Sequence, residues 1–429
     1  MSWAYRVKRT GLALSLALGG CATPGPGSWG DAGFRGRAAT QAAVLPDAAA
    51  TPTPLDLTDL PAAIVGPSSA GQPDRGLGER ECLELAARNS MLGNLLDAKA
   101  RSCGATATEA QRAQHGEPVP PSPADMQSEI LAVAAIEARS ASAGTAMELY
   151  YRLAQAQAQR AIVEEGLAVI DRALEESKLL ETKGIRRPET FEVLQRRSLT
   201  LRDQQLELDR GIAQLSAELR RTLNLGPTAE EWLVRPTLAV KVDPTVVDPA
   251  AAIQDGLARR PELNLLRRLD QQQSPETLRT LRAVLGSAQP LLTLSCRPVT
   301  PSCWTLLGAA LGKGYAGQEL DGEEQAGIRA AWDVYRLDRE QEITKELRVA
   351  ANDVLARLNQ VVVARDQLTT WNQRLERLQT ESKNGIANYS DRVEANLKRL
   401  EAQSVLWEKV FAWDVAVVKL RQAQFTLLP

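Results

Sequence analysis

The sequence has very little histidine, cysteine or aromatic character. It contains one histidine, His115, and five cysteines in 429 residues, and aromatic residues account for 4% of positions. Zinc sites need clustered cysteine and histidine ligands, and no CxxC pair is present. The chain also has no Ser–His–Asp set and no phosphate-binding glycine loop. We therefore expect that it is not an enzyme and that it holds no metal or cofactor.

An excess of charge of one sign is absent as well. Lys and Arg number 51 against 53 Asp and Glu, which gives a net charge of −2. Such a balanced chain offers no electrostatic support to a nucleic-acid partner. Ala, Leu, Arg, Gln and Glu dominate while strand-forming residues are sparse, a composition typical of long helices and coiled coils. We predict a mainly α fold with few or no β-strands.

Long hydrophobic runs are missing apart from a short one near the N-terminus. Arg6, Lys8 and Arg9 precede an apolar run at residues 11–18, which is too short to span a bilayer as a stable helix. This is the pattern of a secretory signal peptide, which we place at residues 1–20. No other stretch is apolar enough for a transmembrane helix.

The signal peptide ends in Leu18-Gly19-Gly20-Cys21, which resembles the lipobox of bacterial lipoproteins. The resemblance implies cleavage before Cys21 and acylation, including palmitate, that anchors the chain to the lipid of the outer membrane. Ala rather than Asp at position 22 implies the outer membrane, with the body in the periplasm. The alternative is an ordinary signal peptide followed by a chance cysteine.

Residues 21–75 and the remaining cysteines give two further expectations. Residues 21–75 are rich in Pro and Ala without a period and predict an extended tether. An exported chain meets oxidising conditions, so disulfides are allowed, although their connectivity is open. On one unbroken helix the first two cysteines would lie about 31 Å apart, too far to pair directly. The candidate disulfide cysteines are Cys82, Cys103, Cys296 and Cys303.

Beyond the tether the chain divides into two tandem pseudo-repeats. We place the first helical repeat at residues 76–227, a linker at 228–249 and the second helical repeat at 250–429. Apolar residues stepping by four and three along the long segments predict coiled-coil packing of antiparallel helical hairpins. The expected helices cover residues 80–102, 126–183 and 189–225 in the first repeat, and 250–270, 322–383 and 391–424 in the second.

Two sequence matches support the duplication. "LAARNSMLGNLL" at 85–96 matches "GLARRPELNLL" at 256–266, and "ETKGI" matches "ESKNGI" about 200 residues later. The glycines of the second match, Gly184 and Gly385, interrupt long helical patterns. We therefore interpret them as the turns at the tips of the two hairpins.

The motif Arg260-Pro261-Glu262-Leu263, the duplication and the glycine-broken hairpins together resemble the TolC family of outer-membrane efflux proteins. The lipobox resembles its lipoprotein, OprM-like branch. The resemblance implies a homotrimer whose hairpins form a hollow duct in the periplasm. It also implies a periplasmic membrane-fusion (adaptor) protein and an inner-membrane pump as partners. Such a duct serves tripartite efflux or type I secretion of small molecules or polypeptides.

The resemblance also points to a gate. In that family the second tip carries acidic residues six and nine positions after the glycine, lining the closed periplasmic entrance. Those positions are Asp391 and Glu394, and Glu189 and Glu192 take a similar place near the first tip. The alternative is a purely local role, with Asp391 or the preceding serine as a helix N-cap.

One departure from the family is a shortage of strands. The family implies four membrane strands per protomer, but residues 104–125 are polar and proline-rich and predict none. Short strands are expected only within 285–315. The second hypothesis is therefore a periplasmic coiled-coil scaffold lipoprotein, derived from the same fold and lacking a transmembrane channel.

Overall fold

A computed structural model describes most of the chain beyond the tether. Its described residues belong to one compact unit that spans residues 52–429. The signal peptide, Cys21, the tether up to residue 73 and the expected strands at 285–315 lie outside them. The described ranges are 74–104, 123–183, 188–226, 232–237, 242, 248–271, 277–278, 322–384 and 389–428.

The first hairpin consists of α4 (Pro123–Thr182) and α5 (Pro188–Thr222), which are 60 and 35 residues long. Both helices begin at a proline, whose missing N–H costs nothing in a first helical turn. The return helix ends in a left-handed residue, Asn224 with φ 49°, whose N–H donates to the Arg221 carbonyl. Since the next N–H reaches back to Arg220, this is a Schellman ending. The helix expected at residues 189–225 therefore ends three residues earlier, at Thr222.

The second hairpin consists of α10 (Gly322–Lys383) and α11 (Tyr389–Ala423), which are 62 and 35 residues long. The bounds of α10 are those expected from the heptad pattern. The return helix α11 also ends in a Schellman arrangement, here around Phe425 with φ 58°. A bulky side chain in this region is strained, so neighbouring contacts must hold it there.

Each of the two short helices expected from the sequence is broken into two. The first becomes α1 (Glu79–Arg88) and α2 (Met91–Gly104), with Ser90 Oγ accepting a hydrogen bond from the Gly93 N–H. The second becomes α6 (Pro249–Arg259) and α7 (Pro261–Gln271). The second break follows from Pro261, because a proline disfavours the helical conformation of the residue before it.

Two short strands join the beginnings of the two halves. Strand β1 (Asp74–Gly78) pairs in parallel with β2 (Leu233–Thr237), which lies in the segment expected to be a linker. The Tyr150 hydroxyl lies 3.1 Å from the carbonyl oxygens of Leu77 and Thr237, at the ends of both strands. The element order is then strand, two short helices, long helix and return helix, twice over in the described residues.

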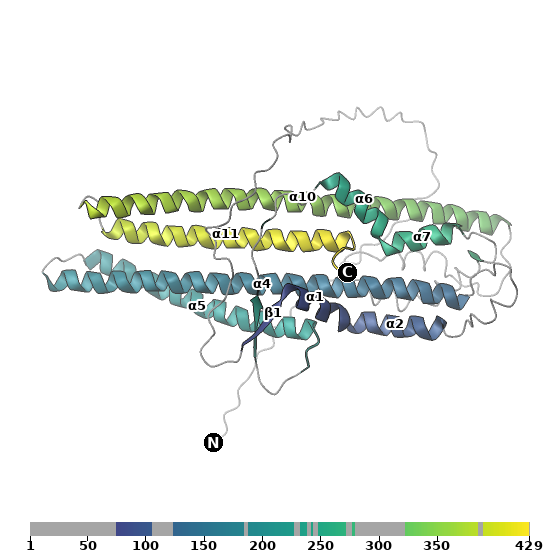
Figure 1. Ribbon diagram of the computed structural model, residues 1–429, viewed down its shortest axis with the longest axis horizontal. Helices are drawn as coiled ribbons and strands as arrows, with labels where there is room; N and C mark the ends of the chain where they lie inside the picture. Colours follow the sequence, from purple (N-terminus) through teal and green to yellow (C-terminus); the bar gives the residue numbers. More distant parts are fainter. Residues whose placement is uncertain are drawn as a thin grey trace, which may run out of the picture. The chain divides into compact units, whose positions relative to one another are not determined.

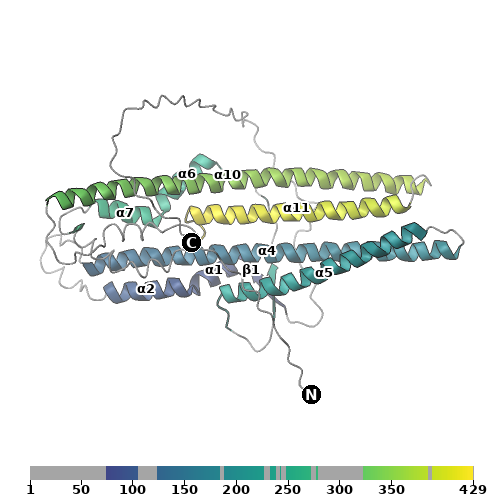
Figure 2. The ribbon, with the colours of Figure 1, turned by 180° about the vertical axis from the view of Figure 1, so that it is seen from behind.

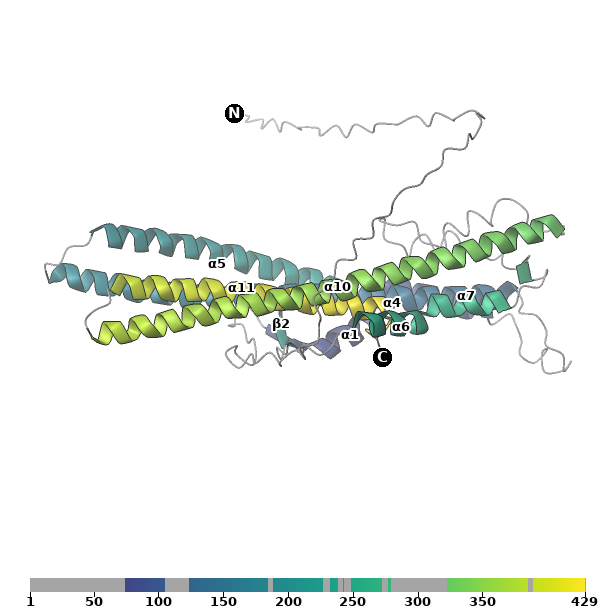
Figure 3. The same cartoon turned by 90° about the horizontal axis from the view of Figure 1, so that it is seen from above.

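The four long helices form one layer in the order α5, α4, α11, α10 (Figures 1 and 2). The two inner helices, α4 and α11, approach closely where a Cβ on Gly144 would lie 2.3 Å from Gln422 Oε1. The main core runs along this contact and includes Tyr150, Trp407 and Phe411. The two edge helices, α5 and α10, each pack mainly against one long neighbour, α4 and α11 respectively, and Figure 3 shows them diverging on either side. Among the described helices, none is long and apolar enough to cross a membrane.

Candidate functional site

The two hairpin ends lie at the same end of the layer, as Figure 1 shows. The tip glycines, Gly184 and Gly385, fall outside the described residues, between α4 and α5 and between α10 and α11. The helices that flank them are described on both sides. The candidate site is therefore built from the last turns of α4 and the first turns of α5 and α11, which we call the tip region.

The acidic residues expected at the tips occupy the first turns of the return helices. Asp391 lies in the first turn of α11, where a carboxylate favours the helix dipole. Glu394 lies one turn further, and both side chains are exposed. Glu192 on α5 is exposed as well, whereas Glu189 lies in the first turn of α5 with its side chain outside the description. Since α11 begins at Tyr389, Ser390 and Asp391 are inside the helix and neither is its N-cap, but a local role of Asp391 in the first turn stands.

A groove of about 280 Å³ separates α5 from α11 in the tip region. Its floor is aliphatic and continues into a small core cluster that includes Ile170 and Ala173 of α4. Its rim is polar. The lining residues are Val193, Leu194, Arg197, Tyr389, Ser390, Val393, Glu394 and Leu397. Of the four acids that the sequence analysis singled out, the groove includes Glu394.

Tyr389 connects the first hairpin to the second at this end. Its phenol is partly buried, and burial together with the adjoining Glu176 carboxylate of α4 raises the pKa of Tyr389 to about 12. The Arg392 guanidinium lies over the ring, 5.3 Å from its centroid. A phenol that keeps its proton at all physiological pH values can donate to a carboxylate across the α4–α11 contact. Sequence analysis missed both Tyr389 and Glu176, because nothing local marks a pairing across more than 200 residues.

Ion pairs continue this connection along the layer. Arg399 of α11 reaches Glu165 of α4 at 2.5 Å, and Arg197 of α5 reaches Glu401 of α11 at 2.8 Å. Arg197 and Glu401 are 36% and 52% exposed, so solvent and salt screen their attraction. These pairs therefore align the two hairpins without fixing them strongly. The tip region can hold the hairpins together and can release them at a modest free-energy cost.

Cys82 is not part of a disulfide. It is a free thiol with 0% of its surface exposed, and it packs in the main core. Burial raises the pKa of the Cys82 thiol to about 12, so it is neither paired nor reactive. This corrects its place among the candidate disulfide cysteines. Cys103 lies at the end of α2 with its side chain outside the description, and Cys296 and Cys303 lie outside the described residues.

Comparison with known proteins gives the class of fold. No family model and no curated protein sequence matches the chain. Solved structures do match. The outer-membrane channel OprN superposes with a TM-score of 0.53 at 13% identity, covering 81% of this chain and 89% of that one. The outer membrane protein VceC of Vibrio cholerae gives 0.52 at 12% identity, covering 81% and 95%.

The CmeC outer membrane channel of Campylobacter jejuni also gives 0.52, at 11% identity, covering 82% of this chain and 86% of that one. Identities this low show the fold alone. The chain has the fold of the TolC-like outer-membrane channels. The mainly helical architecture expected from the sequence is confirmed.

Proposed function

We propose that the chain is the outer-membrane factor of a tripartite efflux or type I secretion system. Three copies would form a helical duct in the periplasm for the export of small molecules or polypeptides. The fold shared with OprN, VceC and CmeC supports this proposal. The observation that carries it concerns the two open edges of the helical layer.

Both edge helices expose apolar side chains at coiled-coil spacing. On α5, Leu199 and Leu206 are seven residues apart and are 61% and 68% exposed. On α10, Val349 and Val363 are fourteen residues apart and are 61% and 57% exposed. Residues seven apart share one helix face, so each edge carries an apolar stripe that α4 or α11 does not cover. Packing α5 of one copy against α10 of the next buries both stripes and closes a ring.

The test is the assembly state of the full chain. Leu206→Glu and Val363→Glu each place a charge in the proposed contact, and we expect the trimer to dissociate. The loss of one buried aliphatic side chain per contact corresponds to about 10- to 100-fold weaker association. Gln204→Glu and Gln379→Glu add the same charge at exposed polar positions of the same helices, away from the apolar stripes, and should leave the trimer intact. Native mass spectrometry that finds a monomer for the unmodified chain would contradict the ring.

Conductance distinguishes a duct from a scaffold. The purified chain should form pores in planar lipid bilayers if it exports molecules. A trimer that forms no pores would favour the periplasmic scaffold lipoprotein instead. Labelling with a palmitate analogue, lost in Cys21→Ser, tests the proposed lipid anchor at the outer membrane.

The groove of the tip region is the proposed contact for the adaptor protein. Its aliphatic floor accepts an apolar side chain, while Glu394, Asp391 and Glu192 nearby favour a cationic neighbour. The exposed acids of three copies would also gather at the entrance of the duct and attract cations. Val193→Glu, which changes a 51% exposed groove residue, should weaken adaptor binding without dissociating the trimer.

A further inference from the structure

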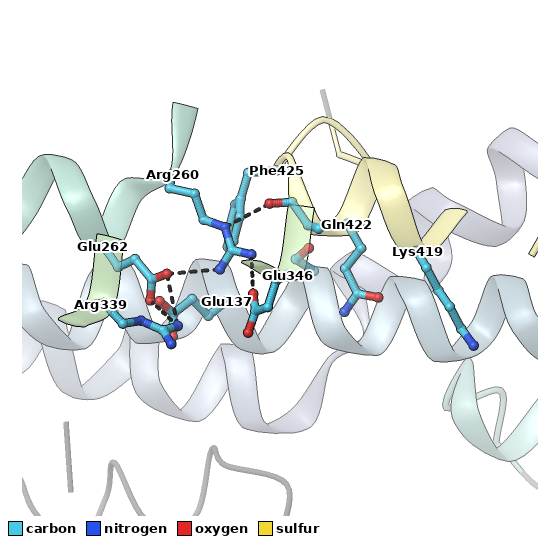
Figure 4. A pocket seen from close by; sticks show the side chains of 10 residues that line it. Glu137, Arg260, Glu262, Arg339, Glu346, Lys419, Gln422 and Phe425 are labelled. Atoms are coloured by element: carbon cyan, nitrogen blue, oxygen red, sulfur yellow. Dashed lines mark hydrogen bonds and ion pairs between the residues drawn. The ribbon is translucent and has the colours of Figure 1, made fainter. Parts of the chain in front are cut away.

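A cluster of charges with a buried centre lies away from the tips, where the α6–α7 break meets α4, α10 and the end of α11. We call it the hub and define it by Arg260, Glu262, Arg339, Glu342 and Glu346. Arg260 contacts Glu262 at 2.9 Å and Glu346 at 2.7 Å. Arg339 contacts Glu262 at 3.1 Å and Glu342 at 2.5 Å. Figure 4 shows the side chains of Arg260, Glu262 and Arg339 pointing toward one another.

The hub also holds the end of α11. The Arg260 Nε donates to the Ala423 carbonyl at 2.8 Å, and its guanidinium lies 5.6 Å from the centroid of the Phe425 ring. These contacts hold Phe425 in its left-handed conformation. The hub therefore joins α7, α10 and α11, all of which belong to the second half of the chain.

Glu137 is the first-half residue that enters this cluster. It projects from α4 toward Glu262 and Arg339, as Figure 4 shows. Each hub arginine already contacts two carboxylates, so Glu137 shares their positive charge with three other acids. The buried Glu137 Oε1 has no hydrogen-bond partner among the described residues. Two adjoining buried carboxylates cannot both stay ionised at reasonable cost, and one proton between them removes the repulsion.

The other polar and charged groups around Glu137 are consistent with a proton shared between Glu137 and Glu262. Lys419 and Gln422 of α11 line the same pocket, and Lys419 is exposed to solvent. On the α2 side, Asp97 is already paired with Arg139 at 3.1 Å. Burial, then the neighbouring Glu262, raises the pKa of Glu137 well above its ordinary value of 4.5. Arg339 and Arg260 outweigh burial at Glu262 and lower its pKa, so the proton belongs to Glu137.

We propose that Glu137 and Glu262 bind one proton between them at neutral pH, and that this proton fastens the first hairpin to the hub. The protonated Glu137 donates to the Glu262 carboxylate, while the two arginines keep Glu262 ionised. Deprotonation would place a second buried negative charge beside the first. The connection between the two halves is then strong in acid and neutral solution and weakens as the proton leaves.

Infrared spectroscopy of the full-length chain tests the proton directly. A protonated carboxyl gives a C=O band that ionised carboxylates lack, and exposed carboxyls have ionised by about pH 6. The measurement uses an Asp414→Asn background, because burial also raises the pKa of Asp414. We expect one protonated carboxyl per chain at neutral pH, lost in Glu137→Gln and retained in Glu394→Gln. Absence of the band in the background chain overturns the proposal without any hub variant.

Glu262→Gln separates a shared proton from simple burial. With Glu262 neutral, Arg260 and Arg339 each lose one carboxylate partner and become available to Glu137, so Glu137 should ionise and the band should disappear. A Glu137 protonated only by burial would keep its band in this variant, which contradicts sharing.

The fastening is tested by amide hydrogen exchange in α4 and α7. Glu137→Gln keeps a donor for Glu262, whereas Glu137→Ala does not. We expect exchange in these segments to be up to about tenfold faster in the alanine variant, the equivalent of one buried hydrogen bond. Equal protection in the two variants would show that the contact fastens nothing.

Discussion

The tip region and the hub use the same residue types in opposite environments. At the tips, Asp391 and Glu394 are exposed and the ion pair between Arg197 and Glu401 is accessible to solvent. In the hub, the side chains of Arg260 and Glu262 are 9% and 3% exposed. Water already stabilises the tip charges, so breaking a pair there costs little, whereas an unpaired hub charge stays buried. Charges in the tip region therefore cost little to separate, whereas those in the centre of the hub cost much more.

The hub should give the largest effect on mutation. Arg260→Ala removes an ion-pair partner of Glu262 and of Glu346. It also removes the hydrogen bond that Arg260 donates to the Ala423 carbonyl at the end of α11. We expect a loss of about 3–5 kcal/mol in the free energy of unfolding, measured by chemical denaturation. Arg259→Ala is the matched control, because its pair with Asp255 is exposed and contributes about 0–1 kcal/mol. If both variants lose the same free energy of unfolding, the buried ion pairs of the hub contribute no more to stability than the exposed pair does.

A second buried carboxyl should make stability depend on pH. Burial, then the nearby Glu79, raises the pKa of Asp414 on α11 well above its ordinary 3.8. Its contribution is fully present below the unfolded pKa and is lost as pH rises through the folded-state pKa. Asp414→Asn should therefore flatten the decline of stability with rising pH. Thermal denaturation across a pH series, with Asp391→Asn at an exposed carboxyl as control, measures the difference. An unchanged slope would contradict the assignment.

Tyr389 should have an intermediate effect that stays local. Tyr389→Phe removes the hydroxyl facing Glu176 but keeps the ring beneath Arg392. We expect a loss of about 1 kcal/mol, seen as faster amide exchange at the start of α11 with global stability little changed. Tyr389→Leu, which also loses the ring contact, should exchange faster still. If the phenylalanine variant protects these amides fully, the hydroxyl does not link the hairpins.

The exposed pair at the tips should give the smallest effect. Arg197→Ala breaks the contact with Glu401 at a cost of about 0.2–1 kcal/mol at low salt. Because the pair is accessible, the difference from the unmodified chain should vanish near 1 M salt, where the screening length is about 3 Å. A difference in stability that persists at high salt would mean that the Arg197–Glu401 pair is protected from solvent, as the Arg260–Glu262 pair of the hub is.

The sequence predicted the long helices well and their junctions poorly. Heptad spacing is a local pattern repeated over many turns, so the bounds of α10 could be read directly. The breaks at Ser90 and Arg260 lie within the two matching segments, which were interpreted as similarity within single helices. Strand β2 was missed because five residues carry no period strong enough to distinguish them from a linker. The expected strands at 285–315 lie outside the described residues and remain a prediction.

The candidate site divides in the same way. The positions of the tip acids came from the family resemblance, which counts them from the tip glycine, and their role as a gate stays a prediction. The partners of Tyr389 and of Arg260 could not be found, because Glu176 and Glu346 are distant in sequence and meet only after the helices pack. The motif Arg260-Pro261-Glu262-Leu263 was singled out as a family resemblance alone. Its physical role in the structure is to break a helix and to place two opposite charges in the hub.

The pairing of β1 with β2 has a mechanical consequence. Tension along the chain that reaches Asp74 is carried first by β1. Because β1 and β2 are parallel and in register, that tension shears all the hydrogen bonds between them together. Tyr150 ties the ends of both strands to the middle of α4. A pull on the proposed lipid anchor would thus be spread over both halves of the chain instead of peeling one helix away.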